Sequence, residues 1–278
     1  MSTLYLVSTP IGNLEDISQR AVRVLREVHL IAAEDTRQTR KLLAHYDIHT
    51  PMTSYHEHNK LIRLEAVISK LAQGDVALVS DAGTPALNDP GVELVRAALH
   101  AGHAVSPIPG PSAPIAALVA SGLPTEAFLY LGYLPRREAE RKMLLAQVIQ
   151  LPYTLVFLET PHRLRLALLD LESVLGDRPC AIARELTKLH EEIFRGNLSA
   201  AQQHFTVHEP RGEFTLVIAG HQESEETRWS IERVYSALAA GLEEGESPSV
   251  LAKRLAGESR WSRREIYRMI SQTGGDSP

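Results

Sequence analysis

Over the first 220 residues, short apolar runs alternate with longer segments in which apolar residues recur every three or four positions. The short runs have the length of buried strands, and the longer segments have the spacing of amphipathic helices. In the first half of the chain, the pattern predicts strands over residues 4–8, 29–33, 76–80 and 104–108. Strands that alternate with helices are typical of an α/β fold.

The pattern breaks near residues 122–124 and then resumes. It predicts further strands over residues 128–131, 153–158, 180–183 and 214–219, with helices near 138–150 and 162–175. A polar segment over residues 220–227 has the composition of a linker, and three short helices are predicted over 231–242, 248–255 and 263–270. We therefore expect two α/β domains, residues 1–121 and 122–220, followed by a small all-helical domain over residues 229–278.

Composition narrows the class of protein. The chain has 278 residues, 44% of them hydrophobic, which is enough for a sizeable core. No stretch approaches the roughly 18 apolar residues of a membrane helix, and no signal peptide is visible, so we expect a cytoplasmic protein without membrane contact. Cys180 is the single cysteine, which excludes an internal disulfide and a cysteine-rich metal site.

Charge and glycine spacing exclude several kinds of nucleotide site. The formal net charge is −5, so any contact with nucleic acid must come from local basic patches. No two of the 17 glycines stand two positions apart and no G-x-x-x-x-G-K occurs, which excludes the common dinucleotide and P-loop turns. His56, Glu57 and His58 are too close in sequence to converge on one ion without further ligands, and no metal is predicted.

Three predicted strands end in loops of small residues and prolines: TPIGN at 9–13, SDAGTP at 80–85 and PGPSA at 109–113. In an open α/β sheet, ligands bind outside the carboxyl ends of the strands, where such loops meet. Small side chains would let a ligand approach the backbone, and Asp81 would meet a cationic or hydroxyl-bearing group. Each loop taken alone is explained as well or better by a tight turn.

Charged residues after the strands leave two interpretations open. In Glu34-Asp35-Thr36-Arg37, Thr36 suits a helix N-cap with two acids near the positive helix end. Asp89 followed by proline suits another N-cap. Arg37, with Arg40 and Lys41, would be either a solvated basic face or a place where phosphates bind.

The tail is basic. Residues 253–268, KRLAGESRWSRREIYR, contain six basic and two acidic residues. With Trp261 and Tyr267 available for stacking, this segment predicts contact with nucleic acid. The alternatives are an ordinary solvated helix face and, for Trp261, a place in the core of the helical domain. A second basic cluster, at residues 136–142, is interrupted by two glutamates.

Seven ordered motifs together resemble one family. They are the three loops above, AEDTR at 33–37, ETPHR at 159–163, ARELTK at 183–188 and GEF at 212–214. Over nearly the whole chain these are similar to the bacterial 16S rRNA cytidine 2′-O-ribose methyltransferases, within the tetrapyrrole-methylase (class III) fold. The wider fold often has Gly-Asp-Pro where this chain has Ser80-Asp81-Ala82, and the rRNA branch carries the same variant.

The resemblance implies a cleft between two α/β domains that binds S-adenosylmethionine, a homodimer, and an RNA-binding tail of helix-turn-helix type. It implies methylation of the 2′-hydroxyl of a decoding-centre cytidine in the 16S rRNA of the small (30S) ribosomal subunit. Because this sulfonium cofactor has no phosphate, the loop at 9–13 needs no glycine-rich anion nest. The implied cofactor-binding residues are Pro10, Asp81, Gly83, Thr84, Ser112 and Ala113, together with Leu158, Ala183 and Thr215, which are matched by strand position alone.

A ribose hydroxyl is a poor acid, so its methylation calls for a side chain that accepts or polarises its proton. The candidates are Asp35, Glu185 and Lys188, with Arg37 or Arg184 holding a flanking phosphate. Glu185 and Lys188, three apart, would otherwise form a simple surface ion pair. The predicted RNA-binding residues are Arg40, Lys41, Lys253, Arg254, Arg260, Arg263, Arg264 and Arg268.

Two other functions remain possible on the same residues. One is a methylase of a tetrapyrrole on the same scaffold, although a small macrocycle gives no reason for basic carboxyl-terminal helices. The other is a metabolite-sensing regulator whose tail binds DNA as a helix-turn-helix.

Overall fold

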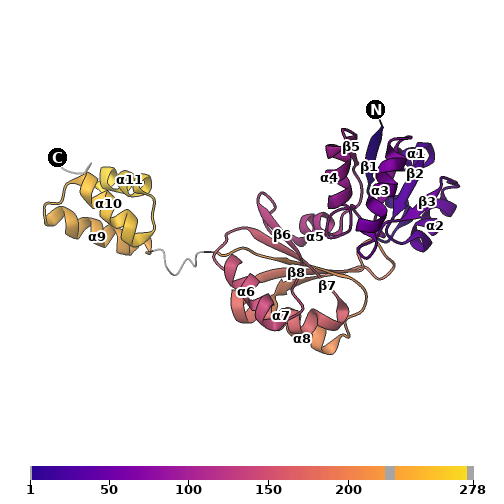
Figure 1. Cartoon of the computed structure of the whole chain (residues 1–278). Helices are drawn as coiled ribbons and strands as arrows, with labels where there is room; N and C mark the ends of the chain where they lie inside the picture. Colours follow the sequence, from indigo (N-terminus) through magenta and orange to yellow (C-terminus); the bar gives the residue numbers. More distant parts are fainter. Residues whose placement is uncertain (1, 223–228, 274–278) are drawn as a thin grey trace. The chain divides into compact units, whose positions relative to one another are not determined.

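A computed structural model describes residues 2–222 and 229–273 of the chain (Figure 1). The chain divides into two compact units, Met1–His221 and Gln222–Pro278. The first contains two five-stranded sheets with helices packed on them, and the second is helical. The predicted α/β fold with carboxyl-terminal helices is thus confirmed. Most of the predicted linker, and the last residues of the predicted helical domain, lie outside the described residues.

The first sheet is entirely parallel, in the order β3-β2-β4-β1-β5. Its strands are β1 (Thr3–Val7), β2 (Leu30–Ala33), β3 (Met52–Ser54), β4 (Val76–Val79) and β5 (Ala104–Ile108). Between them lie a short 3-10 helix η1 (Leu14–Asp16) and the helices α1 (Gln19–Glu27), α2 (Thr36–His45), α3 (Lys60–Leu71) and α4 (Val92–His100).

Alternate strand residues of this sheet enter two separate apolar clusters. Ala77 packs with Leu25 of α1 and Leu43 of α2, whereas its neighbour Leu78 packs with Leu71 of α3 and with residues of α4. Successive strand side chains point to opposite faces, so α1 and α2 cover one face and α3 and α4 the other. A sheet buried on both faces leaves its carboxyl edge as the place where a ligand can reach it.

The second sheet is mixed, in the order β6-β7-β10-β8-β9, with only β6 and β7 parallel. Its strands are β6 (Phe128–Tyr133), β7 (Thr154–Glu159), β8 (Pro179–Arg184), β9 (Glu192–Asn197) and β10 (Phe214–Ile218). Helices α6 (Glu138–Val148), α7 (Pro161–Leu175) and α8 (Leu198–Val207) pack on one apolar cluster.

Helix α5 (Ala113–Ser121) joins the two sheets. It follows β5 of the first sheet, yet Ala117 and Leu118 pack against Val156 and Val217 of the second. Ile11, in the loop after β1, belongs to the same apolar cluster. The loop after β1 and helix α5 therefore pack against the second sheet in one shared apolar cluster.

The second unit consists of α9 (Ile231–Glu243), α10 (Pro248–Ser259) and α11 (Arg263–Thr273), which enclose a small apolar cluster. Trp229 and Trp261 pack against that cluster, and the Trp261 indole N–H donates to the Trp229 carbonyl oxygen at 2.9 Å. Trp261 is therefore partly buried against the core of the helical unit, which agrees with the structural one of its two predicted roles. Within residues 2–222 and 229–273, no helix has the length and apolar character needed to span a membrane.

Candidate active site

A cleft of about 240 Å³ is lined by residues of both sheets of the first unit. The first sheet contributes residues that follow β2 and β4, and the loops after β1 and β5 add Ile11 and Ser112. The second sheet contributes Tyr130 and Tyr133 of β6, Leu158 of β7 and Thr215 of β10. The cleft thus lies at the carboxyl edge of the parallel sheet, where the loop composition predicted a ligand.

The structure brings most of the predicted cofactor-binding residues together. Those that line the cleft are Asp81, Gly83, Thr84, Ser112, Ala113, Leu158 and Thr215. Ala183 lines a narrow hollow of about 30 Å³ that shares Ala113 and Thr215 with the cleft. Pro10 lines a different hollow, which shares Asp81 with the cleft. Contact of these residues with a cofactor stays a prediction.

Hydrogen bonds from backbone and side-chain groups join the three small-residue loops. The Thr9 N–H donates to the Gly83 carbonyl oxygen at 2.9 Å, and the Gly83 N–H donates back at 3.0 Å. The Thr84 hydroxyl lies 3.1 Å from that of Ser8 and donates to the Pro111 carbonyl oxygen at 3.3 Å. Gly83 has a φ of +81°, which other residues rarely adopt. The first two loops are held as a pair, and the third is bonded to the second.

Gly12 is explained by a close approach between two segments. A Cβ at this position would collide with the side chains of Lys188 and Thr187. The neighbouring Asn13 N–H donates to the Thr187 hydroxyl at 3.1 Å. The single glycine of the first loop therefore lets that loop rest on the turn after β8, and no anion nest is involved.

Carboxylates dominate the polar lining of the cleft. Asp81 is joined there by Glu34, Asp89, Glu159 and Glu213, and no lysine or arginine of the described residues lines it. The Asp81 N–H donates to the Glu34 carboxylate at 3.1 Å. Such a surface attracts cations and repels phosphates. Of these five residues, only Asp81 was predicted from the sequence to contact a ligand.

Four of these carboxyl groups, those of Glu34, Asp81, Asp89 and Glu159, have raised pKa values, and burial is the largest cause in each. Burial, followed by the nearby negative charge of Glu34, raises the pKa of Asp89 to about 6. Burial also raises the pKa of Glu34, against the effect of the hydrogen bond from the Asp81 N–H. No ion pair neutralises Asp89 within the part of the chain that the structure describes. Asp89 is therefore a carboxylate that can accept a proton near neutral pH.

The four predicted catalytic residues lie outside the cleft lining, in ion pairs. Asp35 is the N-cap of α2, in place of the predicted Thr36, and its carboxylate lies 2.7 Å from the Arg37 guanidinium. Hydrogen bonds from Arg37 lower the pKa of Asp35 to about 2. Asp35 is thus a weak proton acceptor near neutral pH.

Glu185 and Lys188 form an ion pair, with 2.9 Å between the Lys188 ammonium nitrogen and a Glu185 carboxylate oxygen. This pair was the predicted alternative to a catalytic role for the two residues. Burial alone would raise the pKa of Glu185, but hydrogen bonds from Lys188 and from the Glu213 N–H lower it. Burial would lower the pKa of Lys188, but hydrogen bonds to Glu185 and Glu213 raise it. Lys188 is therefore held in its charged form, which cannot accept a proton.

A bulge in β6 aims two tyrosines at the cleft. Residues three apart on a regular strand face opposite sides, yet Tyr130 and Tyr133 both line the cleft. The pairing of β6 with β7 shifts register between Tyr130 and Gly132, and Gly132 has a φ of +66°. A Cβ at Gly132 would collide with Asn88, next to Asp89. The bulge therefore reorients a side chain and makes room for the loop that carries Asp89.

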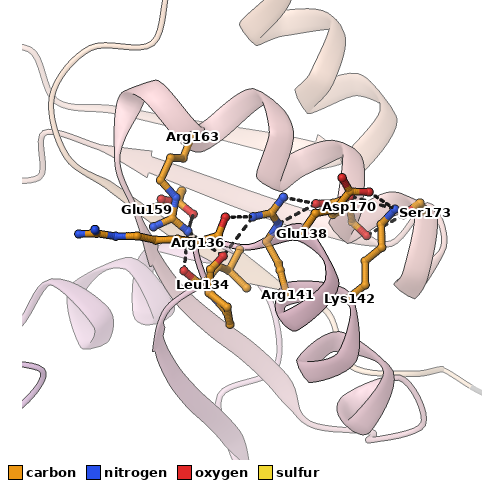
Figure 2. A network of polar contacts seen from close by, with 10 residues as sticks. Leu134, Arg136, Glu138, Arg141, Lys142, Glu159, Arg163, Asp170 and Ser173 are labelled. Atoms are coloured by element: carbon orange, nitrogen blue, oxygen red, sulfur yellow. Dashed lines mark hydrogen bonds and ion pairs between the residues drawn. The ribbon is translucent and has the colours of Figure 1, made fainter.

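The ETPHR motif anchors the end of β7. Figure 2 shows a network of polar contacts that includes Glu159, Arg163, Arg141 and Asp170. The buried Glu159 side chain lies 3.1 Å from the Arg163 guanidinium. Arg163 and Arg141 both donate to the Pro135 carbonyl oxygen, at 3.2 and 3.1 Å, and Arg141 donates to Asp170 at 2.7 Å. This network fixes the chain just after the two tyrosines of β6.

The predicted RNA-binding residues fall into two groups. Arg40 and Lys41 are exposed on α2. In the second unit, Arg254 pairs with Glu246 and Glu258, and Arg263 donates to the Ser249 hydroxyl at 3.0 Å. Arg260 ends α10 in the left-handed conformation. Exposed cationic side chains on α10 and α11 include Lys253, Arg264 and Arg268.

Residues 3–202 match the family described as Tetrapyrrole (Corrin/Porphyrin) Methylases. A protein of Synechocystis sp. named "Ribosomal RNA small subunit methyltransferase I" is 46% identical over 278 residues, covering 99% of this chain and 100% of the relative. The protein of the same name from Bacillus subtilis is 41% identical, covering 96% of this chain and 93% of the relative.

Solved structures show the same fold at low sequence identity. Cobalt precorrin-4 methyltransferase matches with a TM-score of 0.60 at 14% identity, covering 78% of this chain and 94% of that chain. Uroporphyrin-III C-methyltransferase from Thermus thermophilus, complexed with S-adenosylhomocysteine, matches with a TM-score of 0.55 at 20% identity, covering 78% and 97%.

Proposed function

The chain belongs to the tetrapyrrole (corrin/porphyrin) methylase family, with the small-subunit rRNA methyltransferases I as close relatives, and from this premise we propose that it is an rRNA methyltransferase. Its methyl donor is S-adenosylmethionine, and its acceptor is the 2′-hydroxyl of a decoding-centre cytidine in the 16S rRNA of the small ribosomal subunit. The observation that carries the proposal is the acidic cleft, which collects most of the predicted cofactor-binding residues at one sheet edge.

The cleft fits the cofactor chemically. Gly83 and Ala113 leave the backbone accessible, Leu158 offers apolar contact, and the surrounding carboxylates complement a sulfonium cation. The complex of a structural neighbour with S-adenosylhomocysteine supports the same cofactor class. When bound, S-adenosylmethionine supplies an activated methyl group. The chain's own residues then have to orient the acceptor hydroxyl and take its proton.

Asp89 is the proton acceptor in this proposal. It lines the cleft, faces Glu34 and Asp81 without a cationic partner among the described residues, and has Tyr130 and Tyr133 across the cleft. The proton of the ribose hydroxyl passes to the Asp89 carboxylate as the oxygen gains its bond to carbon. Asp35 and Glu185, the carboxylates predicted for this role, are engaged by cations outside the cleft.

The acidic lining also weighs against a tetrapyrrole acceptor. Macrocycles of this class carry carboxylate side chains, which Glu34, Asp81 and Asp89 would repel. The close relatives are likewise named for ribosomal RNA. We also propose that the protein is a homodimer and lies in the cytoplasm. Sedimentation of the purified protein measures its mass in solution and so tests the dimer.

The direct test is transfer of tritiated methyl groups from S-adenosylmethionine into small ribosomal subunits prepared from cells without this activity. We expect one methyl group on the ribose of a single cytidine, located by mapping of the modified nucleotide. Label on a nucleobase, or transfer to a tetrapyrrole in place of the subunit, would contradict the proposal.

The tail is expected to contribute affinity for RNA without affecting the cofactor. Replacing Lys253, Arg264 and Arg268 together by glutamine removes three exposed charges. The logarithm of the RNA-binding constant falls linearly with the logarithm of the salt concentration. In the triple variant this slope should be less steep by about 0.7 for each phosphate that these side chains neutralise in the natural chain. Affinity for S-adenosylhomocysteine, measured by calorimetry, should not change. Arg254→Gln is the matched control, because acids already pair with that guanidinium. An equal loss of cofactor affinity in the triple variant would contradict this division of roles.

A further inference from the structure

An acidic cleft has no place for the phosphates of an RNA chain. A nucleotide within RNA carries a phosphate on each side. Both phosphates are repelled by Glu34, Asp81 and Asp89, the cleft carboxylates that form no ion pair within the described residues. The flanking phosphates therefore require cations beside the cleft. Among the described hollows that share a lining residue with the cleft, the one that contains Pro10 also contains a cationic side chain, Lys41.

This hollow has a volume of about 270 Å³ and lies between the loop after β1, helix α2 and the end of β4. Asp81 lines both the hollow and the cleft, so the two are immediate neighbours. Pro10, Leu14 and Leu42 give it an apolar wall, and the Leu14 side chain is partly exposed. An apolar wall offers contact to the face of a nucleobase, and the cation beside it offers contact to a phosphate.

Helix α2 supplies the cations. Lys41 donates to the Gln38 side-chain oxygen at 3.0 Å, and within the described residues no carboxylate pairs with it. Arg40, one residue earlier, is exposed. The charges of both side chains are therefore available to a phosphate. Arg37 differs, because Asp35 already pairs with its guanidinium.

The wall also contains a hydroxyl without a partner. Thr39 is 4% exposed, and its Oγ1 has no hydrogen-bond partner among the described residues. A buried polar group left without a partner is unfavourable. A ligand with a polar edge that reached the Thr39 hydroxyl would supply the missing hydrogen bond. The Gln38 side-chain amide lines the same hollow.

We infer that this hollow binds a nucleotide adjacent to the methylated one, with its base against Pro10 and Leu14 and its phosphate on Lys41 and Arg40. The inference rests on the proposed function, since it takes RNA as the substrate. It also assigns Pro10, predicted from the sequence to contact the cofactor, to the RNA side of Asp81.

The test uses the full-length chain, saturating S-adenosylhomocysteine, and a fluorescent single-stranded oligoribonucleotide of decoding-centre sequence as the probe. Lys41→Gln should weaken RNA binding about tenfold. It should also make the slope of the logarithm of the binding constant against the logarithm of the salt concentration less steep by about 0.7. Leu14→Asn should weaken binding several-fold with an unchanged salt dependence, because it removes only apolar contact. Neither variant should alter the affinity for S-adenosylhomocysteine.

Lys70→Gln is the matched control. Lys70 is exposed on α3 and, like Lys41, donates to a glutamine three residues away, Gln73, at 3.3 Å. It should bind the probe like the natural chain. Equal affinities of the Lys41, Leu14 and Lys70 variants for the probe would overturn the inference. So would a matching loss of S-adenosylhomocysteine binding in Lys41→Gln, which would assign the hollow to the cofactor.

Failure of this inference and failure of the proposed function give different results. Methyl transfer by the natural chain into small subunits tests the function alone. If the natural chain methylates rRNA but the three variants bind the probe equally, only the nucleotide hollow is wrong. If the natural chain does not methylate rRNA, the function is wrong, while the comparison of Lys41→Gln with Lys70→Gln still decides whether the hollow binds a nucleotide.

Discussion

Asp89→Asn is expected to lower the rate constant of methyl transfer by about 10²- to 10⁴-fold, the usual contribution of a positioned proton acceptor. In the natural chain the rate should rise with pH through about 6 and level off above it, because burial and the charge of Glu34 raise the pKa of Asp89 to about 6. Below that pH the carboxyl group holds its proton and accepts no other. Single-turnover measurements with small subunits between about pH 5 and 8 follow both effects.

The variant should lose this step in the pH profile and retain its affinity for S-adenosylhomocysteine. Asp35→Asn is the control, because Asp35 has a pKa of about 2 and does not titrate in the range measured. Because the carboxyl groups of Glu34 and Asp89 interact, the apparent pKa seen in the pH profile describes the titration of the two groups together. A step that survives in Asp89→Asn and disappears in Asp35→Asn would return the catalytic role to the residue predicted from the sequence.

Asp170→Ala is expected to lower the free energy of unfolding of the first unit by about 3–5 kcal/mol. Arg141 and Asp170 form a buried pair, with side-chain exposures of 7% and 10%. Removing the carboxylate leaves the Arg141 guanidinium buried with only the carbonyl oxygens of Pro135 and Arg136 as acceptors. Urea unfolding followed by far-ultraviolet circular dichroism measures the loss.

Glu138→Ala on α6, the helix of Arg141, provides the comparison, because the ion pair of Glu138 with Lys142 is largely exposed. This substitution should lower the free energy of unfolding by less than about 1 kcal/mol. The double change Arg141→Met with Asp170→Leu should recover much of the loss, since it leaves no unpaired buried charge. Equal losses of unfolding free energy in Asp170→Ala and Glu138→Ala would show that the buried ion pair stabilises the fold no more than the exposed one.

The sequence predicted the meeting of the three loops because the carboxyl ends of parallel strands share one edge of a sheet. It did not predict β3, whose three residues are too few to show an alternating pattern. It also missed β9, where the sequence EIFRGN mixes charged, apolar and small residues without a clear period.

The acidic lining was missed for a different reason. Asp89 was interpreted as a helix cap beside its proline, but α4 begins at Val92 with Gly91 as the N-cap. The pKa of Asp89 depends on burial and on Glu34, which is distant in sequence and belongs to another loop. For Tyr130 and Tyr133, the available signal for a bulge was Gly132 between them, but the predicted strand ended at residue 131 and β6 continues to Tyr133.

Both tryptophans of the chain, Trp229 and Trp261, pack in the small carboxyl-terminal unit, and the first unit contains none. Indole emission from the intact protein therefore reports on that unit alone. The melting of the tail, or its burial under a bound RNA, can be watched optically without labels and without separating it from the enzyme body.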